Sequence, residues 1–128
     1  MQSVTLNKMI DKLELKNLVP EVETDGIEIN SPDINGPALQ LAGYFAHFAS
    51  ERVQIIGYVE YTYLKSLPRE EKLHNYERFL SSEIPCVIFS SRTKPDEDMI
   101  LLARKYKKPL LHSSRLTTSL MAEVIRWL

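Results

Sequence analysis

Cysteine is almost absent from this sequence, in which Cys86 is the only one. A single thiol excludes an internal disulfide and a zinc site built from several thiolates. The sequence has no Asn-x-Ser/Thr acceptor site, and its first five residues show no basic stretch leading into an apolar one. These absences favour the reducing cytoplasm as the location of the protein.

An excess of charge of either sign is also lacking. Lysine and arginine together number 16 and aspartate and glutamate 17, which gives a net charge of −1. A protein that binds the phosphate backbone of nucleic acids carries a basic excess, so nucleic acid is not expected as a partner. The apolar runs are far shorter than the ~20 residues of a membrane-spanning helix, so no membrane partner is expected either.

The glycines, only four in number, do not form a nucleotide-binding motif. None precedes a lysine, so there is no P-loop, and no Gly-x-Gly-x-x-Gly occurs. The zinc-protease motif His-Glu-x-x-His and the nucleophile elbow Gly-x-Ser-x-Gly are missing as well. The three histidines lie far apart along the chain. The sequence therefore predicts no catalytic residues and no metal ligands.

What the sequence does contain is an alternation of short apolar segments with amphipathic ones. Apolar segments predict strands at 27–30, 53–56, 86–89 and 110–111. Helical periodicity predicts helices at 6–15, 68–81, 95–106 and 117–128, whereas residues 59–67 fit a helix or a strand. Thr93 is the candidate N-cap of the helix at 95–106. The order indicates one α/β domain over residues 1–128, with an open, mainly parallel sheet flanked by helices.

The segment 31–57 is the most informative part of the chain. Residues 31–50 read as a long irregular connection, and such connections inside a domain are usually functional or structurally constrained. Gln54 lies in an apolar strand, so its amide must find hydrogen bonds or face outward. One interpretation is that Asn35 and Gln54 pin this connection to the sheet. The other is that they bind a ligand, which would also contact the carboxyl ends of the strands.

Cys86 begins a predicted buried strand. A free cysteine in that position behaves as a small hydrophobic residue. The alternative is a reactive thiol, which together with His112 and loop carboxylates would form a small enzyme.

A pattern within 31–57 carries a family resemblance. Residues 31–45 read Ser-Pro-Asp-Ile-Asn-Gly-Pro-Ala-Leu-Gln-Leu-Ala-Gly-Tyr-Phe, and Arg52-Val53-Gln54 and Gly57 follow. This resembles the N-terminal domain of bacterial HPr kinase/phosphorylase, which has Ser-x-x-Ile-Asn-Arg-Pro-Gly-Leu-x-Leu-x-Gly-Tyr-Phe and then Arg-Ile-Gln and a glycine. Gly36 stands where the family has arginine and Ala38 where it has glycine, so an anion-binding role of that arginine does not carry over.

The resemblance implies a fold similar to the first domain of the muramyl peptide ligases, which holds a uridine nucleotide. It also implies an assembly or regulatory domain without catalytic residues. The parent enzyme would use ATP and magnesium in a separate P-loop domain to phosphorylate a serine of HPr, and would also reverse that reaction, in carbon catabolite repression. HPr and further copies of the enzyme would be the partners.

The kinase domain would be absent from this chain. No cofactor is therefore expected for the chain itself. The last predicted helix is still amphipathic at Leu128, which suggests that the parent protein continues. The alternative is a free-standing module of the same fold that senses a small ligand or a nucleotide. In both cases the predicted ligand-binding residues are Asn35, Gly36, Gly43, Tyr44, Arg52, Gln54 and His112.

Overall fold

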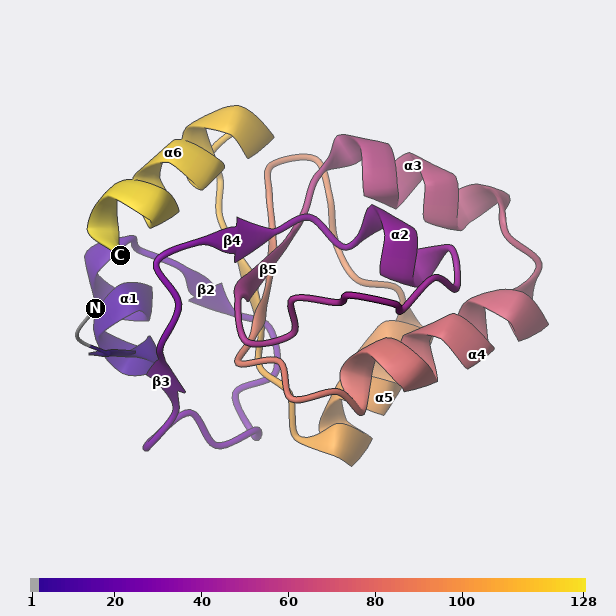
Figure 1. Cartoon of the computed structure of the whole chain (residues 1–128), viewed down its shortest axis with the longest axis horizontal. Coiled ribbons are helices and arrows are strands. Elements are labelled where there is room, and N and C mark those ends of the chain that lie inside the picture. Colours follow the sequence, from indigo (N-terminus) through magenta and orange to yellow (C-terminus); the bar gives the residue numbers. More distant parts are fainter. Residues whose placement is uncertain (1–2) are drawn as a thin grey trace.

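A five-stranded sheet forms the middle layer of the computed structural model, which describes residues 3–128 (Figure 1). In spatial order the strands are β2 (Lys16–Asn17), β7 (Leu110–His112), β6 (Val87–Phe89), β5 (Val53–Ile56) and β4 (Ile34–Asn35). Strands β4, β5, β6 and β7 are parallel, and β2 pairs antiparallel with β7. The prediction of an open, mainly parallel sheet flanked by helices is confirmed.

The central strands are buried on both faces. Ile55, Ile88 and Leu111 are partners in register across β5, β6 and β7, and none of them is exposed to solvent. Parallel strands covered on both sides carry near-continuous apolar runs rather than an alternating pattern. The predicted strands at 53–56, 86–89 and 110–111 therefore show up clearly in the sequence.

The longer helices that cover one face of the sheet can be followed in Figure 1. They are α3 (Tyr58–Ser66), α4 (Arg69–Leu80) and α5 (Glu97–Tyr106). Leu64, Phe79 and Met99 from these helices share one apolar cluster with Ile56 and Phe89 from the sheet. Two helices cover the opposite face, α1 (Leu6–Lys12) and α6 (Thr117–Trp127).

The second apolar cluster lies beneath α1 and α6. Met9, Leu120 and Val124 pack there with Ile55 and Ile88. A small antiparallel sheet of β1 (Val4–Thr5) and β3 (Glu28–Ile29) adjoins the start of α1. Within residues 3–128, no helix combines the length and the apolar character needed to cross a bilayer.

The segment 31–50 contains more structure than its sequence predicts. It holds the two-residue strand β4 and the four-residue helix α2 (Ala38–Leu41), which are too short to produce a periodic pattern. Residues 59–67, which fit a helix or a strand, lie mostly in α3. The Glu60 carboxylate accepts the N–H of Gly57 at 2.7 Å and stabilises the first turn of this helix.

Thr93 does not cap α5, so that prediction was wrong. The N-cap is Asp96, whose Oδ1 accepts the N–H of Met99 at 2.8 Å. A carboxylate makes a charge-assisted bond to a helix N-terminus, which a hydroxyl does not provide. The buried Thr93 hydroxyl instead donates to the carbonyl oxygen of Ser90 at 2.7 Å.

The carboxyl ends of β5 and β6 meet the start of α6. Ser90 Oγ, just after β6, lies 2.8 Å from Thr117 Oγ1. Gly57, just after β5, is buried against the same threonine, and a Cβ at position 57 would lie only 2.6 Å from Thr117 Cγ2. The close approach of α6 to the end of β5 therefore requires glycine at this position.

We expect Gly57→Ala to lower the free energy of unfolding by about 1–3 kcal/mol, because the added methyl group overpacks this contact. Urea denaturation measures the loss. Gly36→Ala is the matched control, since the nearest atom to its Cβ would be the Ile55 carbonyl oxygen at 4.0 Å. Thr117→Ser should restore part of the stability of Gly57→Ala. Equal stability of the two alanine variants would contradict the packing argument.

Candidate functional site

Three side-chain amides join the 31–57 segment to the sheet. The Asn35 side-chain N–H₂ donates to Gln54 Oε1 at 2.7 Å and to Gln40 Oε1 at 3.2 Å. Gln54 in turn donates to the carbonyl oxygens of Arg52 at 2.9 Å and Ala49 at 3.2 Å, and it is fully buried. Asn35 and Gln54 are register partners on β4 and β5, so their side chains leave the same face of the sheet. They pin the connection to the sheet, as one interpretation of the sequence has it.

Gly43 and Tyr44 lie on the loop that follows α2. Gly43 has φ of 96°, and its carbonyl oxygen accepts from Arg78 Nη1 at 3.3 Å. The Tyr44 side chain is exposed, whereas its backbone N–H donates to the carbonyl oxygen of Leu39 at 2.9 Å. The backbone of this loop is therefore held by α2 and α4, while the Tyr44 side chain points into solvent.

Arg52 lies just before β5 and reaches towards β4. Its Nη1 donates to the carbonyl oxygen of Ile34 at 3.4 Å and lies 3.6 Å from Asp33 Oδ2. Gly36 is exposed at the end of β4. With the amides, these residues form one neighbourhood around β4 and α2, and their role in binding a ligand stays a prediction.

His112 lies elsewhere. It ends β7, which is separated from β5 by β6. Its register partners are Phe89 and Lys16, so it shares the face of the sheet that α3, α4 and α5 cover. Cys86 belongs to the cluster beneath α1 and α6 on the opposite face. The sheet thus separates His112 from Cys86, and the two do not form a catalytic pair.

Two hollows lie side by side on the face of the sheet that bears His112. The first, of about 280 Å³, lies between α3, α4 and the start of α5, and the second, of about 570 Å³, lies between β2, β7 and the loop after β6. Tyr61, Lys94 and Pro95 line both hollows, which we call together the cationic groove. Its lysine, arginine, aspartate and histidine side chains are Lys16, Lys65, Lys72, Arg92, Lys94, Asp96 and His112.

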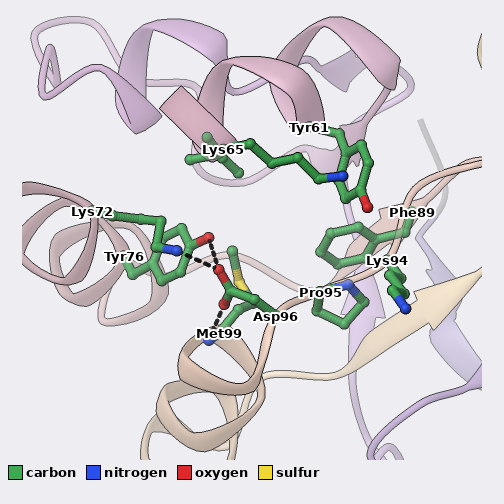
Figure 2. Close-up of a pocket in the computed structure, with 10 residues that line it drawn as sticks. Tyr61, Lys65, Lys72, Tyr76, Phe89, Lys94, Pro95, Asp96 and Met99 are labelled. Carbon is green, nitrogen blue, oxygen red and sulfur yellow. Dashed lines mark hydrogen bonds and ion pairs between the residues drawn. The ribbon is translucent and has the colours of Figure 1, made fainter. Parts of the chain in front are cut away.

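Figure 2 shows the first hollow, in which Lys65 of α3 extends to Tyr61, with its Nζ 4.4 Å from the centre of the ring, while Asp96 at the start of α5 is bonded to Lys72 and Tyr76. Asp96 Oδ2 lies 2.9 Å from Lys72 Nζ and accepts the Tyr76 hydroxyl at 2.9 Å. Burial, and secondly the negative charge of Asp96, raise the pKa of Tyr76 well above its usual range. Tyr76 therefore stays neutral and acts as a hydrogen-bond donor.

Of the groove, sequence reasoning identified His112 alone. The other residues come from α3, α4, α5, β6, the loop after β6, and β2 with the residue after it, and their proximity depends on the fold of the chain. The feature of the sequence that could have indicated the groove is local, since Arg92 and Lys94 flank Thr93 shortly after a predicted strand. No set of three or more His, Cys, Asp or Glu side chains that could hold a metal ion occurs among residues 3–128.

Comparison with known proteins identifies the family. The family described as "HPr Serine kinase N terminus" matches residues 4–128. The chain belongs to this family.

Curated relatives of this HPr serine kinase N-terminal family member are named HPr kinase/phosphorylase. The protein from Lachnoclostridium phytofermentans is 40% identical over the whole chain, and that from Alkaliphilus metalliredigens is 38% identical. The chain spans 41% of the length of each of these two relatives. The resemblance stated from the sequence is confirmed.

A solved structure shares the fold. It contains the CBS and DRTGG domains of the regulatory region of Clostridium perfringens pyrophosphatase, complexed with the activator diadenosine tetraphosphate. The TM-score is 0.60 at 14% identity, over 94% of this chain and 45% of that one. At this identity the likeness shows the α/β fold alone.

We expect Asn35→Ala to destabilise the domain by about 1–3 kcal/mol, because it leaves the buried oxygens of Gln40 and Gln54 without their donor. Hydrogen exchange of the backbone between residues 42 and 52 should accelerate in the same variant. The matched control is Asn30→Ala, which alters an exposed asparagine and should change stability by less than about 0.5 kcal/mol. If Asn35→Ala changed neither the stability nor the hydrogen exchange, the amides would not be what holds the connection.

We expect Cys86 to make the folded state less stable in alkali. Burial raises the pKa of its thiol from 9.0 to about 12. Above pH 9 the unfolded chain therefore loses this proton while the folded chain keeps it, so the free energy of unfolding falls. The loss at pH 10 is about 1.4 kcal/mol. Urea denaturation at several pH values measures it, and Cys86→Ala should lack this part of the decline. An identical decline in both proteins would contradict the assignment.

Proposed function

We propose that this chain is a non-catalytic N-terminal domain of an HPr kinase/phosphorylase, where it serves in assembly or regulation. The observation that carries the proposal is the match of the whole chain, at 40% identity, to 41% of the Lachnoclostridium phytofermentans protein. Neither the sequence motifs nor the geometry of residues 3–128 supply a P-loop or a nucleophile with its base. Chemistry in such a protein would be the task of another domain.

The parent protein would phosphorylate and dephosphorylate a serine of HPr, and thereby act in carbon catabolite repression. HPr would be its partner, and copies of the parent would associate into a homo-oligomer in the cytoplasm. The names of the relatives and the family resemblance support these statements. Exposed apolar side chains, among them Leu39, Tyr58, Val59 and Leu116, would be available for contacts in such an assembly.

A second candidate is a free-standing module that senses a small ligand. The observation that favours it is the cationic groove, which lies partly at the carboxyl ends of β6 and β7. Ligands of open α/β sheets bind at such strand ends. Both candidates make the domain a binding unit, and they differ in whether a kinase responds to it.

A chimera separates the two candidates. This chain would replace the corresponding part of the Lachnoclostridium phytofermentans HPr kinase/phosphorylase. We expect the chimera to phosphorylate HPr from ATP and magnesium and to keep the oligomeric state of the parent, while the 128-residue chain alone gives no phosphoserine. Phosphorylation is measured by mass spectrometry of HPr. A folded but inactive chimera with altered oligomeric state would favour the free-standing module, and activity of the chain alone would overturn both.

A further inference from the structure

We propose that the cationic groove binds a small organic phosphate. The proposal deepens the regulatory function proposed above and rests on it for its biological meaning, whereas the binding site itself rests on the groove. Three features of the groove support the proposal: cations without carboxylate partners, an apolar floor and a constrained loop.

Positive charge in the groove is largely uncompensated. The two hollows are lined by the five cations Lys16, Lys65, Lys72, Arg92 and Lys94 and by a single carboxylate, that of Asp96. Lys72 Nζ lies 2.9 Å from Asp96 Oδ2 and neutralises the charge of this carboxylate. Within residues 3–128, none of the other four cations forms an ion pair with a carboxylate.

This excess is local, since the whole chain has a net charge of −1. Other cations of the described chain do find carboxylates: Arg69 lies 3.1 Å from Asp98, and Lys105 lies 3.3 Å from Glu77. A concave surface lined by one sign of charge concentrates the field and attracts counter-ions. The groove is therefore suited to an anion with more than one negative charge.

The floor of the larger hollow favours an organic anion over an inorganic one. Leu18, Pro95 and Ile100 line it, while Lys16, Arg92 and Lys94 supply its cations. The hollow measures about 570 Å³, which lies within the range of about 300–1,000 Å³ that is usual for small-molecule sites. An apolar surface beside cations matches a sugar or a base that carries phosphate.

The loop after β6 holds its two cations in place. Arg92 has φ of 68°, a left-handed conformation that is uncommon for residues other than glycine. Such a conformation persists where the surroundings determine it, and it clusters at ligand sites. Here the anchors are Thr93, bonded to Ser90, and the N–H of Ser91, which donates to the carbonyl oxygen of Arg115 at 2.9 Å. Arg92 and Lys94 are thus presented on either side of a fixed, buried threonine.

The test is an NMR titration of the ¹⁵N-labelled chain with three probes: ADP, ribose 5-phosphate and adenosine. We expect ADP or ribose 5-phosphate to shift amide signals of residues 90–96 and of His112, and adenosine to leave them unchanged. The two phosphates distinguish a nucleotide from a sugar phosphate as the preferred class. Equal binding of adenosine, shifts confined to another surface, or no shift up to about 10 mM of either phosphate would overturn the proposal.

A pair of charge-matched double variants tests the groove itself. We expect Arg92→Gln with Lys94→Gln to weaken binding of the phosphate by about tenfold or more, since two charge-assisted bonds are lost. Lys107→Gln with Lys108→Gln removes the same charge outside the groove, and Lys107 shares the left-handed backbone of Arg92 with φ of 57°. This control should change affinity by less than about twofold. An equal loss in both double variants would show attraction by net charge alone and would overturn the site.

Phosphate binding by the groove and regulation of a kinase by this domain can be refuted independently of each other. Binding to the isolated chain, lost in Arg92→Gln with Lys94→Gln, establishes the groove whether or not a kinase responds. The same double substitution in the chimera then tests regulation: it should abolish any effect of the phosphate on HPr phosphorylation, whereas Lys107→Gln with Lys108→Gln should keep that effect. A chimera that ignores the phosphate despite binding would overturn the regulatory role and leave the site intact.

Discussion

Burial of the parallel strands on both faces is the constraint on which the rest of the structure depends. Ile55, Ile88 and Leu111 stack in register at the centre of the sheet and are inaccessible to solvent. Helices must therefore cover both faces, and polar groups are displaced to the ends and edges of the sheet. The amide network lies at the β4 edge, and the cationic groove extends from the ends of β6 and β7 to the β2 edge. The location of every candidate site follows from this one arrangement.

The fold was largely predictable because its decisive elements carry strong local patterns. Residues 86–89 and 110–111 are apolar throughout, and 53–56 is apolar except for Gln54. The helices at 69–80 and 97–106 are amphipathic over several turns. The edge strand β4 and the helix α2 were not predictable, since two and four residues are too few for a period to appear. β4 exists because its backbone pairs with β5, a contact between residues about twenty positions apart.

The candidate site was predictable to a lesser degree, for the same reason. The link between Asn35 and Gln54 could be inferred because a buried amide must be satisfied, and the structure supplies the bond at 2.7 Å. The groove could not be inferred, because Lys16, Tyr61 and Arg92 meet only after β2 has paired with β7 and α3 has packed on the sheet. An anion site assembled from single cations on several elements leaves no motif in the sequence.

A net charge near zero does not imply a surface without a preference for ions. Outside the groove, cations such as Arg69 and Lys105 lie beside carboxylates, and at a Debye length of roughly 8 Å widely separated charges hardly reinforce one another. Within the groove, by contrast, Arg92 and Lys94 stand on one short loop, Lys16 lines the same hollow, and the only carboxylate is already neutralised by Lys72. Such an arrangement attracts an anion at short range without making the whole protein basic. A compact groove of this kind matches a single small phosphate better than it matches the backbone of a nucleic acid, because a repeating phosphate backbone favours an extended basic surface.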